Sequence, residues 1–199
     1  AVQGYLASIA FCDAMLGRVF RALETSPKGR ETNVVLWSDH GWHLGEKLHW
    51  RKFSLWERST RNLLMWNIPG LTKPGGRSPR TVSLMDIYPT LIEVLGAPPR
   101  NGIEGQSLVA QLRDPMAARK EPALTTYGRA NHSVRTERWR YTRYADGGEE
   151  LYDEVNDPNE WTNLASRPEH AALKKELASW LPATDAPDSP TAPERPVLH

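Results

Sequence analysis

An apolar segment of the chain ends abruptly on Asp39, His40 and Gly41. The residues before them, 33–37, are mostly β-branched or apolar, which is typical of a strand covered on both faces in a parallel sheet. Binding sites in open α/β sheets gather at the carboxyl ends of such strands. Because Asp39 offers an anionic oxygen and His40 a nitrogen, the pattern predicts a metal site. A plain turn explains the same tripeptide, since Asp tolerates turn geometry and Gly permits a positive φ.

Strand and helix patterns alternate over the first 120 residues. The predicted elements are an amphipathic helix over 5–24, strands over 33–37, 63–68 and 81–84, and a helix over 86–95. Such alternation is typical of α/β architecture. We therefore predict an α/β domain over residues 1–120.

The pattern changes after residue 120. Short strands are predicted over 123–127, 133–136, 140–144 and 150–152, followed by a helix over 168–181. The glycines at 147 and 148 mark a hairpin turn. We expect a small antiparallel sheet covered by a helix over residues 121–182, and an extended proline-rich tail over 183–199.

Charge and hydropathy limit the classes of partner. The formal net charge is +1, so no overall field favours nucleic acid or an anionic membrane surface. No apolar run is long enough to span a bilayer. The chain begins at Ala1 without Met and without the basic start of a signal peptide, which favours a processed or partial sequence.

Lys52 is the basic residue best placed to join the predicted metal site. It lies 13 positions beyond Asp39 (52 − 39), enough for the chain to leave the strand end and return to one pocket. A lysine there presents a point charge to an oxyanion. The alternative is an ordinary solvated surface charge, for Lys52 as for Lys47. Glu57 and Arg61, at i and i+4, are interpreted as a structural pair.

Segment 38–61 resembles the second metal- and sulfate-binding segment of type I sulfatases, which belong to the alkaline phosphatase-like superfamily. It is most similar to the iduronate-2-sulfatase-like branch. Three further segments agree in order: 83–91, 105–108 and 149–164. The resemblance covers nearly all of residues 1–181.

The resemblance implies a fold and a set of residue roles. The fold is the C-terminal part of an alkaline phosphatase-like sandwich, with a small antiparallel sheet plus helix as a subdomain. Asp39 and His40 fall on ligands of a divalent cation, usually Ca²⁺. Lys52 falls on the catalytic lysine that contacts the substrate sulfate, and His49 and His132 are further candidates for substrate contact. Calcium prefers oxygen ligands, so His40 could instead hydrogen-bond the nucleophile or the sulfate.

The chain lacks the nucleophile that the resemblance implies. These sulfatases use a formylglycine made from the cysteine of Cys-x-Pro/Ala-x-Arg, whereas Cys12 is followed by Leu16 at the arginine position. Cys12 lies within the first predicted helix and is expected to be packed and inert. The nucleophile and two metal-binding aspartates are expected upstream of Ala1, in a missing N-terminal part that would be this chain's partner. Alone, the chain is predicted to be inactive.

The leading hypothesis is therefore the C-terminal portion of a sulfatase acting on a sulfated small molecule or glycan. The resemblance also implies a periplasmic or secreted protein. One alternative is a phosphate or phosphonate ester hydrolase of the same superfamily, with Ser or Thr as the upstream nucleophile. Another is a noncatalytic carbohydrate-binding or interaction module on the same scaffold.

Overall fold

A computed structural model describes residues 1–187. The predicted proline-rich tail therefore lies outside the described residues from 188 onward. The elements in chain order are α1 (Val2–Glu24), η1 (Gly29–Glu31), β1 (Val34–Trp37), β2 (His43–Leu44), η2 (Glu46–Leu48), β3 (Trp50–Arg51), α2 (Glu57–Thr60), β4 (Leu64–Asn67), η3 (Leu84–Asp86), α3 (Ile87–Val94), α4 (Val109–Arg113), β5 (Ala123–Thr126), β6 (His132–Arg135), β7 (Trp139–Arg143), β8 (Glu149–Asp153), η4 (Pro168–His170) and α5 (Ala171–Ala178).

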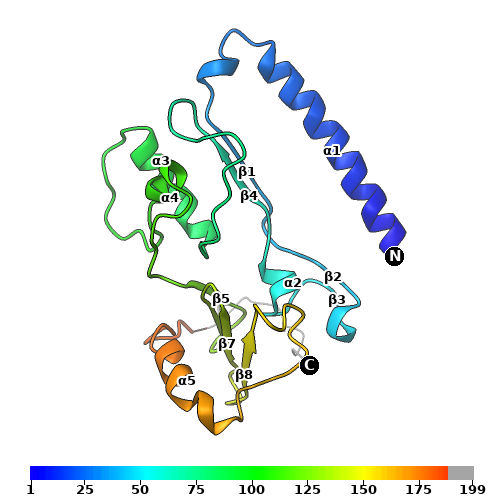
Figure 1. Ribbon diagram of the computed structural model, residues 1–199, viewed down its shortest axis with the longest axis vertical. Coiled ribbons are helices and arrows are strands. Elements are labelled where there is room, and N and C mark those ends of the chain that lie inside the picture. Colours follow the sequence, from blue (N-terminus) through cyan, green and yellow to red (C-terminus); the bar gives the residue numbers. More distant parts are fainter. Residues whose placement is uncertain (188–199) are drawn as a thin grey trace.

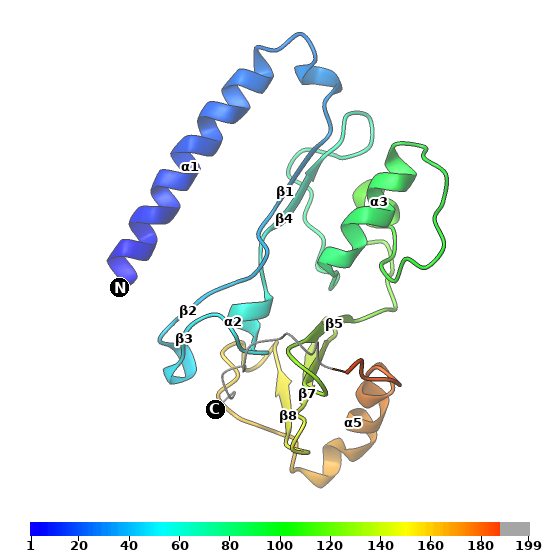
Figure 2. The same cartoon turned by 180° about the vertical axis from the view of Figure 1, so that it is seen from behind.

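The first helix confirms the predicted amphipathic pattern but buries none of its side chains. Figures 1 and 2 show α1 running beside the β1–β4 pair while standing clear of it. Three residues of its apolar stripe, Leu6, Ile9 and Val19, are at least half exposed. Cys12 is exposed too, so the expectation that it is packed is wrong. The described residues therefore cover the apolar stripe of α1 only in part, whereas its periodicity alone predicts burial.

Strands β1 and β4 pair in the antiparallel direction, with Val35 opposite Trp66 and Trp37 opposite Leu64. The prediction of a parallel strand covered on both faces is wrong for the described chain, because Trp37 is 51% exposed. An apolar, β-branched run favours extended backbone but carries no information about the direction of its neighbour. The second strand, predicted over 63–68, is confirmed and stops before Pro69.

The strand predicted over 81–84 does not form. Ser83 instead begins η3 through a capping box, in which its side chain accepts from Met85 N and the Asp86 carboxylate accepts from Ser83 N. This reciprocal pair satisfies free N–H groups at a helix start and competes with an extended conformation. The helix predicted over 86–95 is confirmed as α3, and it ends before Gly96 at φ 61°.

The predicted small antiparallel sheet is confirmed, with strand order β5-β6-β7-β8. Gly147, at φ 87°, makes the tight turn between β7 and β8. Side chains of the sheet and of α5 form the main apolar core, which contains Val134, Tyr141, Leu151, Leu177 and Leu181. The helix therefore covers one face of the sheet, as expected. Among the described residues, no helix is long and apolar enough to cross a bilayer.

Candidate active site

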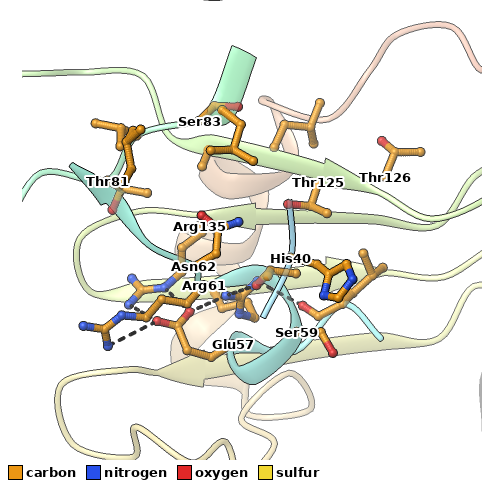
Figure 3. A pocket seen from close by; sticks show the side chains of 18 of the residues that line it. His40, Glu57, Ser59, Arg61, Asn62, Thr81, Ser83, Thr125, Thr126 and Arg135 are labelled. Carbon is orange, nitrogen blue, oxygen red and sulfur yellow. Dashed lines mark hydrogen bonds and ion pairs between the residues drawn. The ribbon is translucent and has the colours of Figure 1, made fainter. Parts of the chain in front are cut away.

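A cavity of about 740 Å³ lies between the end of β1 and the edge strand β5. Its walls include Asp39, His40 and Lys52 together with Thr125 and Thr126. Figure 3 labels His40, Thr125 and Thr126 among the side chains that line it. The volume falls within the range of about 300–1,000 Å³ typical of small-molecule sites. Three of the five residues predicted for the site thus share one cavity.

The imidazole of His40 lies close to both the predicted lysine and the predicted carboxylate. Lys52 Nζ donates to His40 Nε2 at 2.8 Å, and Asp39 Oδ2 lies 3.6 Å from the same nitrogen. Because Nε2 accepts, Nδ1 carries the proton and donates to the Gly41 carbonyl at 2.8 Å. This backbone bond fixes the tautomer in which Nε2 is unprotonated. In this structure the single Nε2 lone pair accepts from Lys52, and a metal ion bound at Nε2 would replace that hydrogen bond.

Gly41 is required for a close approach and not for a positive φ. A Cβ at this position would lie 2.1 Å from the Arg58 carbonyl oxygen and 2.6 Å from that of Arg61. Gly41 N donates to the Ser59 carbonyl at 2.7 Å, which holds the segment against α2. The absence of a side chain at residue 41 therefore sets the position of the neighbouring His40.

The loop that presents Lys52 has an unusual backbone. Four of its residues have a positive φ although none is glycine: Lys47 (54°), Leu48 (57°), Arg51 (76°) and Phe53 (70°). Each such residue is conformationally costly, and outliers of this kind cluster at functional sites. Lys52 lies between two of these residues, Arg51 and Phe53. The direction of its side chain therefore depends on a costly backbone conformation that other contacts must stabilise.

Two histidines provide part of the contacts that stabilise this loop. His49 Nε2 donates to the Lys52 carbonyl at 3.0 Å, and the His49 ring meets the His43 ring edge-on at 4.9 Å. His43 is fully buried and its Nε2 lies 3.1 Å from Ser54 Oγ. Burial, and then the nearby His49, lower the pKa of His43. His49, a predicted substrate contact, contacts the backbone of Lys52 and does not line the cavity.

Lys47 ties the same loop to the antiparallel sheet. Its ammonium donates to the Glu160 carbonyl at 2.5 Å and to Tyr152 Oη at 3.1 Å. It also lies 4.6 Å from the ring centroids of Trp56 and Tyr152. The interpretation of Lys47 as a solvated surface charge is therefore wrong. Sequence could not reveal the hydrogen bonds to Tyr152 and Glu160, because both residues lie more than 100 positions away.

A buried ion cluster fastens α2 to the sheet. The side chain of Arg140 is almost fully buried, and it contacts three carboxylates: Glu57, Glu154 and Glu160. Arg140 Nη1 also donates to the Leu55 carbonyl at 3.0 Å, three residues after Lys52. Burial raises the pKa of Glu154 and Glu160, whereas the arginines overcome burial and lower the pKa of Glu57.

Glu57 combines that long-range role with the predicted local one. Arg61 Nη1 lies 3.8 Å from Glu57 Oε1, so the predicted structural pair is confirmed (Figure 3). Arg135 on β6 donates to the same carboxylate at 3.0 Å. Because the guanidinium of Arg61 is largely exposed, the pair with Arg135 is the stronger contact.

His132 is placed apart from the cavity. It is 2% exposed, its Nε2 lies 2.6 Å from Asp185 Oδ1, and its Nδ1 lies 2.8 Å from Thr126 Oγ1. If Nε2–H donates to the carboxylate, Nδ1 accepts from the threonine hydroxyl. His132 therefore does not line the cavity itself but is hydrogen-bonded to Thr126, which does.

Several cavity residues were not predicted from the sequence. Thr125, Thr126 and Tyr127 belong to β5 or follow it directly, and Phe53 follows Lys52. Nothing in their local sequence marks them as functional, because a strand of Ala, Leu and Thr reads as an ordinary edge strand. Their place beside Lys52 depends on contacts between distant segments.

The described residues supply only some of the ligands that a metal ion needs. Within residues 1–187, no group of three or more His, Cys, Asp or Glu side chains could hold a metal ion. Asp39 and His40 supply two converging donors, and the Asp39 side chain is 82% exposed. An exposed carboxylate and an imidazole with a fixed tautomer fit two positions of a divalent cation's coordination shell.

Comparison with known sequences shows similarity to one family. The sequence model described as Sulfatase matches residues 1–97. A protein named sulfatase from Formosa agariphila is 42% identical over 185 residues, which covers 93% of this chain and 36% of that protein. This chain is similar to members of the sulfatase family. Arylsulfatase K of Homo sapiens is 32% identical over 177 residues, covering 81% of this chain and 33% of the human protein. The chain thus spans about a third of the length of these relatives.

Solved structures confirm the fold. A protein in complex with its substrate D-glucosamine-2-N,6-O-disulfate matches 88% of this chain and 38% of its own chain, with a TM-score of 0.75 and 26% identity. The phosphonate monoester hydrolase of Agrobacterium radiobacter matches with a TM-score of 0.74 and 28% identity, over 86% of this chain and 38% of its own. The predicted α/β, alkaline phosphatase-like fold class is therefore confirmed.

Proposed function

We propose that this chain is the C-terminal portion of a sulfatase that hydrolyses sulfate esters, with its nucleophile in sequence outside these 199 residues. One observation carries the proposal: Lys52 Nζ lies 2.8 Å from His40 Nε2 at a cavity wall that also includes Asp39. A cation, an imidazole and a carboxylate at one position form a site suited to a substrate anion together with a metal ion.

Each residue has a distinct role in this proposal. Lys52 binds a sulfate oxygen through its ammonium group and stabilises the negative charge of the transition state. Asp39 and His40 would hold a divalent cation, Ca²⁺ by resemblance, which when bound neutralises charge on the sulfate. The attacking group would be a formylglycine from the upstream sequence. The loop over residues 47–53 keeps Lys52 directed at the cavity before substrate arrives.

A carbohydrate ester is the substrate class that we propose. The structure in complex with D-glucosamine-2-N,6-O-disulfate and a structure described as a 2-O GAG sulfatase, with a TM-score of 0.72, support this choice. The cavity of about 740 Å³ has room for a sugar ring with its sulfate. Placement in the iduronate-2-sulfatase-like branch and export from the cytoplasm remain sequence-based predictions.

A phosphate or phosphonate ester hydrolase is the second candidate. It is favoured by the similarity to a phosphonate monoester hydrolase, whose TM-score nearly equals that of the sugar-sulfate complex. Lys52 does not discriminate between the two chemistries, because a lysine binds any oxyanion as a point charge.

The experiment that separates these candidates uses a protein in which the coding sequence upstream of Ala1 is included. Release of sulfate from glucosamine 6-sulfate is compared with release of phosphate from glucosamine 6-phosphate and with hydrolysis of a phosphonate monoester. The proposal predicts that the sulfate ester has the highest kcat/KM. Faster hydrolysis of either phosphorus ester would overturn it. The 199-residue chain alone is expected to release no sulfate, and turnover by that chain would contradict the assignment of the nucleophile to upstream sequence.

A further inference from the structure

Phe53 and Tyr127 form an aromatic pair at the cavity. Their ring centroids are 6.0 Å apart with planes inclined at 49°, and both residues line the cavity. They come from distant segments, the loop after β3 and the end of β5. Phe53 is 52% exposed despite this contact. An apolar ring that remains half exposed inside a concave site is available to a ligand.

The backbone holds the Phe53 ring in this position at a cost. Phe53 has φ 70°, a conformation that is uncommon for bulky residues. Positive φ values at Lys47, Leu48 and Arg51 show that the whole loop is affected. Such conformations persist where the surroundings enforce them and are typical of ligand clamps. The ring is thus directed by the same backbone that directs Lys52.

An anion subsite and an apolar subsite are adjacent here. Lys52 Nζ lies 5.3 Å from the centroid of the Phe53 ring. A ligand that fills both must carry its negative charge on a group attached close to an apolar face. Thr125 and Thr126 line the same cavity. The Thr126 hydroxyl is hydrogen-bonded to His132 Nδ1 and keeps its acceptor lone pairs. The two threonines provide hydrogen-bonding partners at the border of the aromatic surface.

A sulfated pyranose has this combination of groups. One face of its ring presents C–H groups, which are attracted to the negative faces of aromatic rings, and its hydroxyl groups extend sideways. An aryl sulfate also has a flat ring, but it has no groups to pair with the two threonines. The polar border therefore favours a sugar.

We propose that Phe53 and Tyr127 form a platform for the pyranose ring of a sulfated sugar whose sulfate is bound by Lys52. This inference rests on the proposed sulfatase function and adds a substrate subsite to it. The platform combines a residue next to the sulfate contact with a residue that directly follows β5 of the antiparallel sheet. The sheet thus helps to position the substrate subsite.

Binding to the protein that includes the upstream sequence, with its proposed nucleophile replaced by alanine, tests the platform without requiring turnover. Saturation-transfer NMR and calorimetry are used with glucosamine 6-sulfate, glucosamine, phenyl sulfate and inorganic sulfate. We expect saturation transfer from protein to the pyranose ring protons, and a lower Kd for glucosamine 6-sulfate than for the other three probes. Phe53→Ala and Tyr127→Ala are expected to weaken binding of the sulfated sugar by about three- to tenfold, the range for aromatic pairs. Binding of inorganic sulfate is expected to be unchanged.

Matched variants separate ring contact from loss of structure. Tyr127→Phe and Phe53→Tyr retain the rings and are expected to bind the sulfated sugar with nearly unchanged affinity. Trp161→Ala removes an exposed aromatic ring outside the cavity and is expected to have no effect. Equal losses for the sugar and for inorganic sulfate, no effect of either alanine variant, tighter binding of phenyl sulfate, or no binding of the sulfated sugar would each overturn the platform.

The two proposals fail in different assays. If the longer protein releases sulfate but the alanine variants bind the sulfated sugar normally, the platform is wrong and the sulfatase function stands. If the ring protons receive saturation and the longer protein hydrolyses only phosphorus esters, the sulfatase function is wrong.

Discussion

Lys52 Nζ donates a hydrogen bond to His40 Nε2 at 2.8 Å, which joins the loop after β3 to the end of β1. The bond places a positive charge next to an imidazole whose tautomer is set by the Gly41 carbonyl. Asp39 lies on the same side of the ring. The three functional groups therefore converge within 14 residues of sequence, while the groups that hold them come from the whole chain.

Removal of the Asp39 carboxylate should weaken the binding of calcium and so raise the calcium concentration that activity requires. In the protein that includes the upstream sequence, we expect Asp39→Asn to raise the Ca²⁺ concentration for half-maximal sulfate release by about tenfold or more, because ligand charge sets Ca²⁺ affinity. A calcium titration after chelation measures this. Asp13→Asn, an exposed change on α1, is the control. An unchanged calcium requirement in Asp39→Asn would exclude this residue as a ligand.

A methyl group at position 41 should disturb the site through packing. Its Cβ would lie 2.1 Å from a carbonyl oxygen of α2, so either the α2 backbone or His40 must move. We expect Gly41→Ala to lower the free energy of unfolding by about 1–3 kcal/mol, as is usual for overpacking. Gly4→Ala is the control, because that helical glycine has no atom within 4 Å and alanine favours helix. Urea denaturation compares the two, and equal stabilities would contradict the close approach.

The contact between Lys47 and the sheet should stabilise the loop that carries Lys52. Lys47→Met leaves the Glu160 carbonyl without its charged donor, and we expect a loss of about 1.5–3 kcal/mol. Hydrogen exchange should rise in residues 45–53 more than in the sheet. Lys175→Met, an exposed change on α5, should have little effect on either measurement. Unaltered exchange in the loop of Lys47→Met would show that the contact does not order it.

Glu160 should make stability depend on pH. Burial raises its pKa from the ordinary 4.5 to about 7, so its stabilising contribution is fully present below pH 4.5 and is lost as pH rises through 7. Glu160→Gln resembles the protonated form. Its stability relative to the original chain should therefore increase by about 1–3 kcal/mol between pH 5 and pH 8. Thermal unfolding across this range measures the difference. A difference in stability that does not change with pH would contradict the raised pKa. Glu169→Gln, at an exposed site, is the control and should show such a pH-independent difference.

Local sequence patterns predicted most of the helices and strands but not which other segments each of them packs against. The periodicity of α1 and the hairpin turn at Gly147 are encoded within a few residues, and both predictions are confirmed. The direction of the partner of β1 and the exposure of Cys12 depend on which surfaces face each other. The predicted strand over 81–84 failed because the local capping of Ser83 by Asp86 was not recognised.

The residues of the candidate site also fall into a group that local sequence predicts and a group that it does not. Asp39, His40 and Lys52 were predicted from spacing and resemblance, and the structure brings them together at one cavity. Phe53 and Tyr127 were missed, because a positive φ and a contact across 74 residues (127 − 53) leave no local signal. Domain boundaries near residues 120 and 182 remain predictions.

In the proposed mechanism, Lys52 binds the sulfate that undergoes hydrolysis. The most direct measurement is kcat/KM for sulfate release from glucosamine 6-sulfate by the protein that includes the upstream sequence, compared with its Lys52→Met variant. Loss of one charge-stabilising contact should lower kcat/KM by about 100- to 1,000-fold. Lys52→Arg should retain more activity than Lys52→Met, and Lys73→Met, in an exposed loop, should match the original protein. A Lys52→Met variant that releases sulfate at the original rate would contradict the account.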